Sequence, residues 1–441
     1  MTKTVLTAVL VVACGAFACG GSSDAGAIDT SVNDGGTTFA DGGSSGDDGG
    51  TTTGDGATTD APAGDTGMPS GNYPAFPPFM GELVNNGGPV LSAPKIVTVT
   101  WPNDNSTAIL EDFGDKIGAS QYWQTAVGEY GVGAATSGAA NHVHVATAPP
   151  AQMSDQDIRN FIAANAGSVL PAPTSQTMYM LWLHPNTKLM FGGGEACASG
   201  IGGYHNDTTV NGTIVAYGVV PRCGSIQSAT SAGSHEIGEA ATDPQPSGSA
   251  GWVGFSDATT VFNLWQRNNV ENGDACEFFK DSFYTDTGLG YAVQRLWSNK
   301  QGALGHSPCQ PFTGTYFNVT PLGLQDLVVD LSQAGGTANT HTKGFHAAQG
   351  ETITFEIGFY SDGPTSGPWT VKAYESNPLV NPVTGRLTVA VDPMKTTGVN
   401  GEKTKVSVTV TQAGPAKVEL MTLVSTLGAV SHYMPVLIGS N

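Results

Sequence analysis

The stretch Ser234–Pro244 reads SHEIGEAATDP, and the central part of the chain is organised around it. If this stretch is helical, His235 and Glu239 lie one above the other on the same face, because positions i and i+4 are neighbours on an α-helix. Two such side chains can bind one metal ion. We expect the helix to cover about residues 228–241 and to end before Pro244, since proline cannot continue a helix.

The spacing is a variant of the zinc-peptidase pattern H-E-x-x-H, in which two histidines bind Zn²⁺ and the intervening glutamate is the general base. Glu236 takes the place of that base, whereas Glu239 stands where the pattern has its second histidine. Catalytic zinc takes three protein ligands. Glu271 and Asp274 lie tens of residues downstream, and either could complete the site with His235. Carboxylate oxygens are harder ligands than histidine nitrogen, so with two carboxylates another divalent ion could replace Zn²⁺.

Two residues before the motif are further candidates for the same site. His205 could be a ligand or a donor to a developing oxyanion, and Tyr204 could be such a donor. The alternative is a helix whose His and Glu only hydrogen-bond to neighbouring loops. His142 and His144 share one face of an expected strand, and we interpret them as strand-face histidines because no acidic or cysteine partner is evident nearby.

Composition narrows the class of protein. The chain has 441 residues and a formal net charge of −20, which argues against a nucleic-acid partner because such a partner requires a basic surface. Only 12% of the residues are charged, and glycine is abundant. Together with short apolar runs, this composition favours an exported, β-rich protein. Nothing in it indicates an oligomeric state.

The first 72 residues are typical of export and tethering. Residues 1–19 combine a basic start with a short apolar run, as in a secretory signal. Cys19 follows small residues and would be the lipidated residue of a bacterial lipoprotein, with Cys14 as a competing site. Residues 20–72 consist mainly of Gly, Ser, Thr, Asp and Ala, and we expect a disordered tether. We therefore expect an outward-facing lipid-anchored or secreted protein whose only membrane contact is the lipidated cysteine.

The other four cysteines lie after the tether. In an exported chain an even number favours disulfides. Pairing by proximity in the sequence would join Cys197 to Cys223 and Cys276 to Cys309. Two other pairings remain open, because connectivity cannot be deduced from sequence alone.

The pattern of apolar and turn-forming residues changes near Pro311, and we expect a domain boundary there. Residues 73–311 contain apolar, β-branched runs of strand length at 95–101, 177–183 and 212–220, with helical spacing at 108–130 and 154–164. Residues 312–441 contain short alternating runs separated by Gly, Pro, Asn and Asp, which suit an immunoglobulin-like sandwich. We expect His341, His346 and His432 to be surface histidines. The predicted fold class is α+β, with a zincin-like central domain followed by the all-β sandwich.

Ordered motifs between about residues 81 and 311 resemble the Exordium, or phosphate-induced, protein family of plant walls and its bacterial relatives. The motifs are Asn86-Gly87-Gly88-Pro89-Val90-Leu91 with the strand to Trp101, then Tyr122-Trp123, Gly203-Tyr204-His205, His235-Glu236-Ile237-Gly238-Glu239 with Asp243-Pro244, Glu271-Asn272-Gly273-Asp274-Ala275-Cys276, and Cys309. The resemblance implies an exported protein and groups His235, Glu236, Glu239, Glu271 and Asp274 as one set. It implies no proven activity. Gly238 stands where the family usually has Ala.

These observations predict a surface protein that hydrolyses peptide bonds in protein or peptide substrates with a bound metal ion, Zn²⁺ first among the candidates. In this prediction His235, Glu239 and one of Glu271 or Asp274 are ligands, and Glu236 is the base. The alternative is a non-catalytic surface or matrix protein of Exordium type, whose metal site is structural or vestigial.

Overall fold

The computed structural model describes residues 67–266, 270–312, 314–330, 338–379 and 383–440. The predicted signal and lipidation sites, and most of the predicted tether, lie outside these ranges. Within them, no helix is both long enough and apolar enough to span a membrane. Ser70, near the end of the predicted tether, donates its backbone N–H to the Asn400 carbonyl at 2.8 Å. The boundaries near residues 72 and 311 stay predictions.

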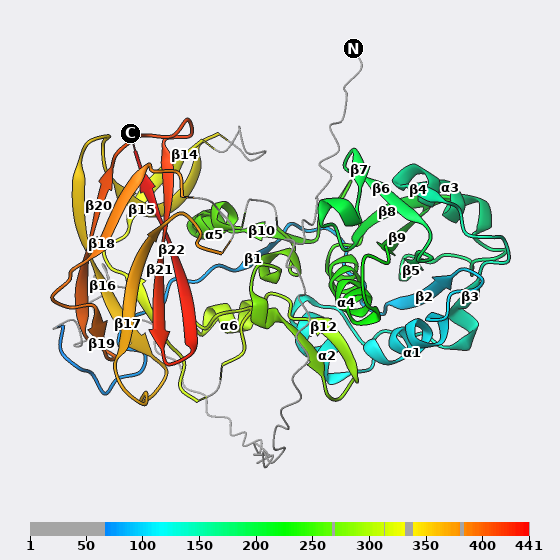
Figure 1. Ribbon diagram of the computed structural model, residues 1–441, viewed down its shortest axis with the longest axis horizontal. Helices are drawn as coiled ribbons and strands as arrows, with labels where there is room; N and C mark the ends of the chain where they lie inside the picture. The colour runs from blue at the N-terminus through cyan, green and yellow to red at the C-terminus, as the bar shows by residue number, and fades with distance from the viewer. Residues whose placement is uncertain (1–66, 267–269, 313, 331–337, 380–382, 441) are drawn as a thin grey trace, which may run out of the picture. The chain divides into compact units, whose positions relative to one another are not determined.

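A five-stranded sheet forms the frame of the central region (Figure 1). Its order is β3-β2-β5-β9-β8, and every neighbouring pair is parallel except β8 and β9. The strands are β2 (Lys95–Thr100), β3 (His142–His144), β5 (Thr177–Trp182), β8 (Tyr204–Val210) and β9 (Thr213–Val220). The apolar runs predicted at residues 95–101, 177–183 and 212–220 are its three middle strands. They are buried on both faces, which explains why they read as continuous apolar runs.

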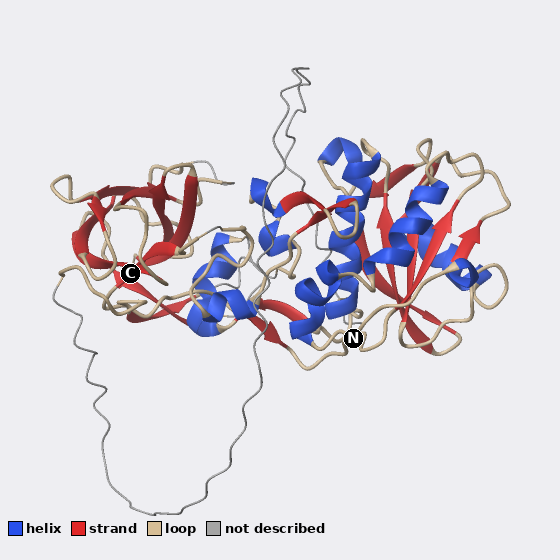
Figure 2. Ribbon diagram, turned by 90° about the horizontal axis from the view of Figure 1, so that it is seen from below, coloured by secondary structure: helices blue, strands red, loops and turns tan. Residues whose placement is uncertain are grey.

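Helices cover both faces of this sheet (Figure 2). On one face lie α1 (Thr107–Ile117), α2 (Gln121–Val127) and α4 (Ile226–Thr242), whose apolar side chains share a core with Met178, Met180 and Trp182 of β5. On the other face, α3 (Asp155–Asn165) shares a second core with Tyr179 and Leu181 of the same strand. Successive residues of β5 therefore enter opposite cores, as the two-residue period of a strand requires.

Local signals fix the ends of the helices. Ser154 accepts a hydrogen bond from the Asp157 backbone, and the Asp157 side chain accepts one from the Ser154 backbone, which completes the expected capping box. The side chain of Ser225 accepts a hydrogen bond from the Ser228 N–H and caps α4. The helix expected over residues 228–241 is therefore confirmed and begins at Ile226.

Shorter elements complete this region. They are β1 (Leu83–Asn85), β4 (Gln152–Ser154), β6 (Lys188–Phe191), β7 (Gly194–Glu195), β10 (Trp252–Phe255), α5 (Thr260–Trp265), β11 (Phe283–Asp286), β12 (Tyr291–Gln294) and α6 (Asn299–Ala303). The antiparallel hairpin β11–β12 has Val293 in the same core as α4. Disulfides join Cys197 to Cys223 and Cys276 to Cys309, so the pairing by proximity is confirmed.

The C-terminal region consists of β-sheets. One sheet has the order β13-β16-β20-β18 and the other β14-β15-β22-β21-β17-β19. Apolar side chains from both sheets form one core around Trp369 and Phe359. The strands are β13 (Phe317–Pro321), β14 (Gln325–Val329), β15 (Thr340–His346), β16 (Thr352–Ser361), β17 (Trp369–Glu375), β18 (Leu387–Val391), β19 (Thr397–Gly398), β20 (Lys403–Val410), β21 (Val418–Leu427) and β22 (Val430–Gly439).

The interpretation of His432 as a surface histidine is wrong. Its side chain is 1% exposed and packs against the rings of Tyr316 and Phe317, with centroid distances of 4.3 and 5.0 Å. Burial, and after it the charge of His306, lowers the pKa of His432 to about 3, so the imidazole is neutral in the folded protein at ordinary pH.

Candidate metal centre

The cluster begins on the C-terminal half of α4. His235 and Glu239 meet as the spacing predicts, with His235 Nε2 3.0 Å from Glu239 Oε1. The helix lies deep in the protein around the motif because two of its positions there are glycines. A Cβ on Gly233 would lie 2.2 Å from the Trp182 ring, and one on Gly238 would lie 2.3 Å from Leu296. Each glycine lowers the stability of the helix by about 1 kcal/mol, but it allows the neighbouring side chain to pack directly against the helix backbone.

Gln294 at the end of β12 fixes the orientation of the His235 ring. The Gln294 side-chain amide donates to the Gly273 carbonyl at 2.7 Å, so its oxygen is the acceptor that faces His235 Nδ1 at 2.9 Å. His235 Nδ1 therefore carries the proton that it donates to Gln294. In the neutral ring Nε2 then holds a lone pair, and this atom faces the carboxylates. A hydrogen bond of this kind behind a histidine is common at metal sites.

The loop after Val270 brings the two downstream carboxylates into the cluster. Asp274 Oδ1 lies 3.6 Å from His235 Nε2, and the Asp274 backbone N–H donates to Glu239 Oε1 at 3.0 Å. The single turn Asp274–Cys276 is held by the Cys276–Cys309 disulfide. Of the two acidic residues considered as third ligand, Asp274 is therefore the one beside His235.

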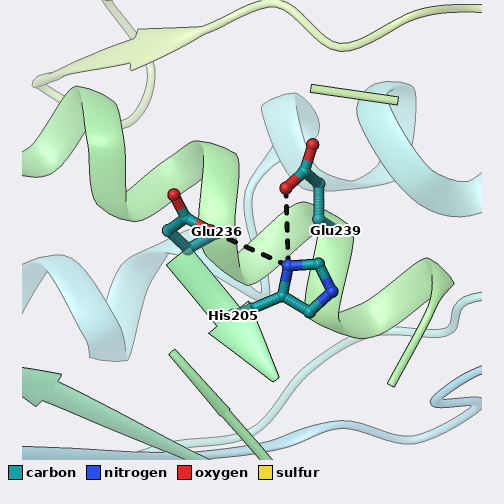
Figure 3. A group of neighbouring side chains, drawn as sticks. All are labelled: His205, Glu236 and Glu239. Carbon is teal, nitrogen blue, oxygen red and sulfur yellow. Dashed lines mark ion pairs between the residues drawn. The ribbon is translucent and has the colours of Figure 1, made fainter. Parts of the chain in front are cut away.

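His205 is the second residue of β8, and its ring faces Glu236 and Glu239 (Figure 3). His205 Nδ1 lies 3.4 Å from Glu239 Oε2 and 3.8 Å from Glu236 Oε2. Its Nε2 lies 3.2 Å from the Asp243 carbonyl and 3.3 Å from Glu271 Oε1. Glu271 is thus a partner of His205, on the ring nitrogen opposite the motif.

Tyr204 points away from this cluster. Its hydroxyl donates to Asp155 Oδ1 at 2.9 Å, and its ring stacks on Phe191 in the core on the other face of the sheet. The reason is the alternation of side chains along β8, which sends neighbours to opposite faces. Tyr204 and His205 therefore cannot both serve the site, and the structure places only His205 there.

All six clustered side chains are buried. Their exposed fractions are 9% for His205, 2% for His235, 1% for Glu236, 1% for Glu239, 3% for Glu271 and 6% for Asp274. Three buried polar atoms in the cluster make no hydrogen bond with the residues described, namely His235 Nε2, Glu236 Oε2 and Glu271 Oε1. Each of them lies 3.0–3.8 Å from an oppositely charged group without the geometry of a hydrogen bond. A buried polar atom without a hydrogen bond is costly, and a bound ion would offset that cost.

Both histidines favour the charged form. Burial lowers the pKa of His205, but the charge of Glu271 and hydrogen bonds to carboxylates outweigh it, so the pKa lies well above its ordinary value. Burial likewise lowers the pKa of His235, and the charges of Glu239 and Glu236 outweigh it. Each ring nitrogen that faces the cluster therefore lies where a positive charge is stabilised.

The carboxylates divide into two kinds. Burial raises the pKa of Glu236, Glu271 and Asp274. Burial also acts to raise the pKa of Glu239, but the charge of His235 outweighs it and the pKa falls below its ordinary range. Glu239, at the centre, is the carboxylate most firmly held as an anion.

Two glycines leave the space into which the carboxylates fit. A Cβ on Gly203 would lie 2.6 Å from Glu236 Oε1, and one on Gly273 would lie 2.8 Å from Glu239 Oε1. The backbone at these two glycines therefore packs directly against the side chains of the motif. Any larger residue at either position would displace a carboxylate.

Sequence reasoning missed Gln294 and the carboxylates beside the histidines of β3. No pattern marks a single glutamine at the end of a strand. His142 Nε2 lies 2.9 Å from Asp115 Oδ1, and His144 Nε2 pairs with Glu111. The expectation that these histidines have no acidic partner is wrong, because α1 places its i,i+4 carboxylates beside the edge strand.

No family model matches this chain, and no curated protein matches it. Among solved structures, domains 4 and 5 of the S-layer protein SbsC are 18% identical, with 31% of this chain and 70% of that chain covered and a TM-score of 0.16. The I-band fragment I67–I69 from titin is 12% identical, with 30% of this chain and 33% of that chain covered and a TM-score of 0.17. A family 123 glycoside hydrolase from Clostridium perfringens is 8% identical over 29% and 27%, with a TM-score of 0.18. Scores this low carry no argument about function.

Proposed function

We propose that this chain is an exported metal-dependent hydrolase of zincin-like character that cleaves peptide bonds. The observation that carries the proposal is the direction of one lone pair. Gln294 holds the proton of His235 on Nδ1, and the free Nε2 then faces Glu239 and Asp274 at 3.0 and 3.6 Å with no hydrogen bond of its own. A lone pair facing two carboxylates is repelled by them unless a positive charge lies between, which is a proton in the charged imidazole and a metal ion when the neutral ring is a ligand.

The distances suit such a cation. Zinc–ligand distances of about 2.1 Å in a tetrahedral arrangement place neighbouring ligand atoms about 3.4 Å apart. The distances from His235 Nε2 to Glu239 and to Asp274 are 3.0 and 3.6 Å, one slightly shorter and one slightly longer than this separation. One nitrogen and two oxygens are acceptable to Zn²⁺ and also to Mn²⁺, so the donor set does not select zinc alone.

The chemistry follows from the residue types. A bound divalent cation lowers the pKa of a water molecule and polarises a carbonyl group. Glu236 is the next carboxylate on the same helix, and its pKa is raised by burial, which suits a group that accepts and returns a proton. The spacing of His235, Glu236 and Glu239 on one helix is what supports the zincin-like assignment.

Export is part of the same proposal. Its support in the folded region is the pair of disulfides, which form and persist in oxidising compartments. The anchor would be a lipid on Cys19, with Cys14 as the alternative, as the sequence predicts.

The burial of the clustered side chains favours a second candidate function. Every side chain of the cluster is at least nine-tenths buried, a state common to ions that hold a fold together. In that case the chain is a non-catalytic surface protein whose metal ion stabilises the contact of α4 with the 271–274 loop.

Metal analysis and one substitution separate these functions. The purified chain is dialysed against Zn²⁺ and then against metal-free buffer, and its metal content and its cleavage of a denatured protein substrate are measured. For the hydrolase we expect retained metal and a loss of cleavage of at least about a hundredfold in Glu236→Gln. Glu82→Gln, at an exposed position, is the matched control. Retained metal without cleavage by either protein supports the structural ion, and absence of metal refutes both.

A further inference from the structure

The cluster contains two groups of potential ligands that share Glu239. One comprises His235, Glu239 and Asp274, and the other comprises His205, Glu236 and Glu239. We propose that the protein binds two divalent cations, with Glu239 as the carboxylate that bridges them. This proposal rests on the proposed function for the first ion and adds a second ion at His205.

The two oxygens of Glu239 face different histidines. Oε1 lies 3.0 Å from His235 Nε2, and Oε2 lies 3.4 Å from His205 Nδ1. In Figure 3 the His205 ring presents Nδ1 to Glu236 and Glu239 together. The separation of 3.4 Å equals the distance of about 3.4 Å expected between two ligands of one tetrahedral ion. The two ions of known two-metal hydrolytic sites lie about 3.5–4 Å apart.

The tautomer of His205 supports the second ion. Its Nε2 lies 3.2 Å from the Asp243 carbonyl, which can only accept, so Nε2 carries a proton. In the neutral ring Nδ1 then bears the lone pair, and this atom faces Glu239 and Glu236 at 3.4 and 3.8 Å. His205 thus repeats the arrangement of His235, with one nitrogen fixed from behind and the other directed at Glu239.

A buried carboxylate oxygen without a hydrogen bond on the side of His205 is a separate observation. Glu236 Oε2 makes no hydrogen bond with the described residues, although the side chain is 1% exposed. A carboxylate oxygen in that position requires a proton or a cation. Glu271 contributes differently, since it lies on Nε2 of His205 and would orient the ring rather than bind the ion.

The charge of the cluster is compatible with two divalent ions. The ligand groups and Glu271 place four carboxylates together, and the ion pairs given for them in the described residues are with His205 and His235 alone. Two divalent cations supply the four positive charges that would balance these carboxylates. With one ion at His235, the two remaining negative charges would be balanced by a charged His205 and one protonated carboxyl group.

The second ion changes the role of Glu236. With two ions bound, Glu236 is a ligand, and the pair of ions acts on the oxygens of a peptide or ester substrate as the two-metal hydrolases do. The metal content of Glu236→Gln therefore distinguishes the two roles. If Glu236 is only a base, the variant keeps the metal content of the wild-type protein, whereas if Glu236 is a ligand, the variant loses metal.

The test counts metal ions in the purified full-length chain. After equilibration with excess Mn²⁺ and removal of free ion, we expect two equivalents in the wild-type protein. His205→Gln should bind one equivalent, because the Gln amide replaces Nε2 and its contact with Asp243 but leaves no ligand at Nδ1. Glu236→Gln should also bind one. His144→Gln, at an exposed histidine outside both groups, should bind two.

Electron paramagnetic resonance of the same samples tests the bridge. Two Mn²⁺ ions joined by Glu239 are magnetically coupled, so the wild-type spectrum should differ from the isolated-ion spectrum expected for His205→Gln. Circular dichroism verifies that this variant is folded. If it is not folded, Glu236→Gln replaces it.

Each outcome has one meaning. A single equivalent in the wild-type protein, unchanged by His205→Gln, overturns the second ion and leaves the proposed function intact. Two equivalents without magnetic coupling overturn the bridge. Absence of metal from the wild-type protein overturns both proposals, whatever the variants show.

Discussion

Replacing Gly233 by Ala tests why the motif helix carries glycines. The added Cβ would lie 2.2 Å from the buried Trp182 ring, well inside van der Waals contact, and the indole is rigid. Overpacking of this kind costs 1–3 kcal/mol, and an overlap this large suggests about 3 kcal/mol. Higher helix propensity returns about 1 kcal/mol. We expect a net loss of about 2 kcal/mol in the free energy of unfolding.

A double-mutant cycle makes the test decisive. Trp182→Phe removes the ring atoms that Cβ would meet, so Gly233→Ala in that background should stabilise the protein by about 1 kcal/mol through propensity alone. The sign of the effect therefore reverses. Urea unfolding, followed by circular dichroism with disulfides intact and a chelator present, measures all four proteins at equal m-values. Gly128→Ala, where a Cβ meets nothing within 4 Å, is the control. Equal effects in both backgrounds would refute this account of the glycines.

Three other substitutions have defined outcomes. The pKa of His432 is lower in the folded than in the unfolded protein, so the free energy of unfolding should fall as the pH drops below about 6.5. His432→Leu should make this loss about 2 kcal/mol smaller between pH 6.5 and 4.5, as measured by urea titrations at the two pH values. Gly273→Ala, whose Cβ would lie 2.8 Å from Glu239 Oε1, should weaken metal binding at least about tenfold by calorimetry, whereas Gly128→Ala should not; equal affinities would contradict the crowding. Tyr204→Phe should leave the metal content unchanged, and loss of metal would show that its hydroxyl serves the site after all.

The periodicity of apolar residues was sufficient to predict the middle strands of the central sheet and the helix that carries the motif. The three apolar runs are the middle strands of the sheet, and α4 begins within two residues of the expected position. Strand β15, with the sequence THTKGFH, carries no clear alternating pattern, because polar residues and a glycine interrupt it. Propensity is a weak signal where pairing with neighbouring strands decides the structure.

The composition of the cluster was predictable only where spacing fixes geometry. The i,i+4 rule brings His235 to Glu239, whereas the choice between Glu271 and Asp274 depends on how one loop turns beside the helix. The two-residue period of β8 could have excluded Tyr204, since His205 and its neighbour must face opposite sides. Gln294 lay beyond prediction, because its role arises from a contact across 59 positions of sequence.

Gln294 also joins separate segments of the chain. Its backbone N–H donates to the Ser234 hydroxyl, and its side chain links His235 to the Gly273 carbonyl. A ligand that binds only the native arrangement stabilises it by mass action, and here that stabilisation would spread along these hydrogen bonds. The helix, the loop and the β11–β12 hairpin should then open as one cooperative unit, and the slowing of amide hydrogen exchange in the hairpin would report on ion binding in the helix.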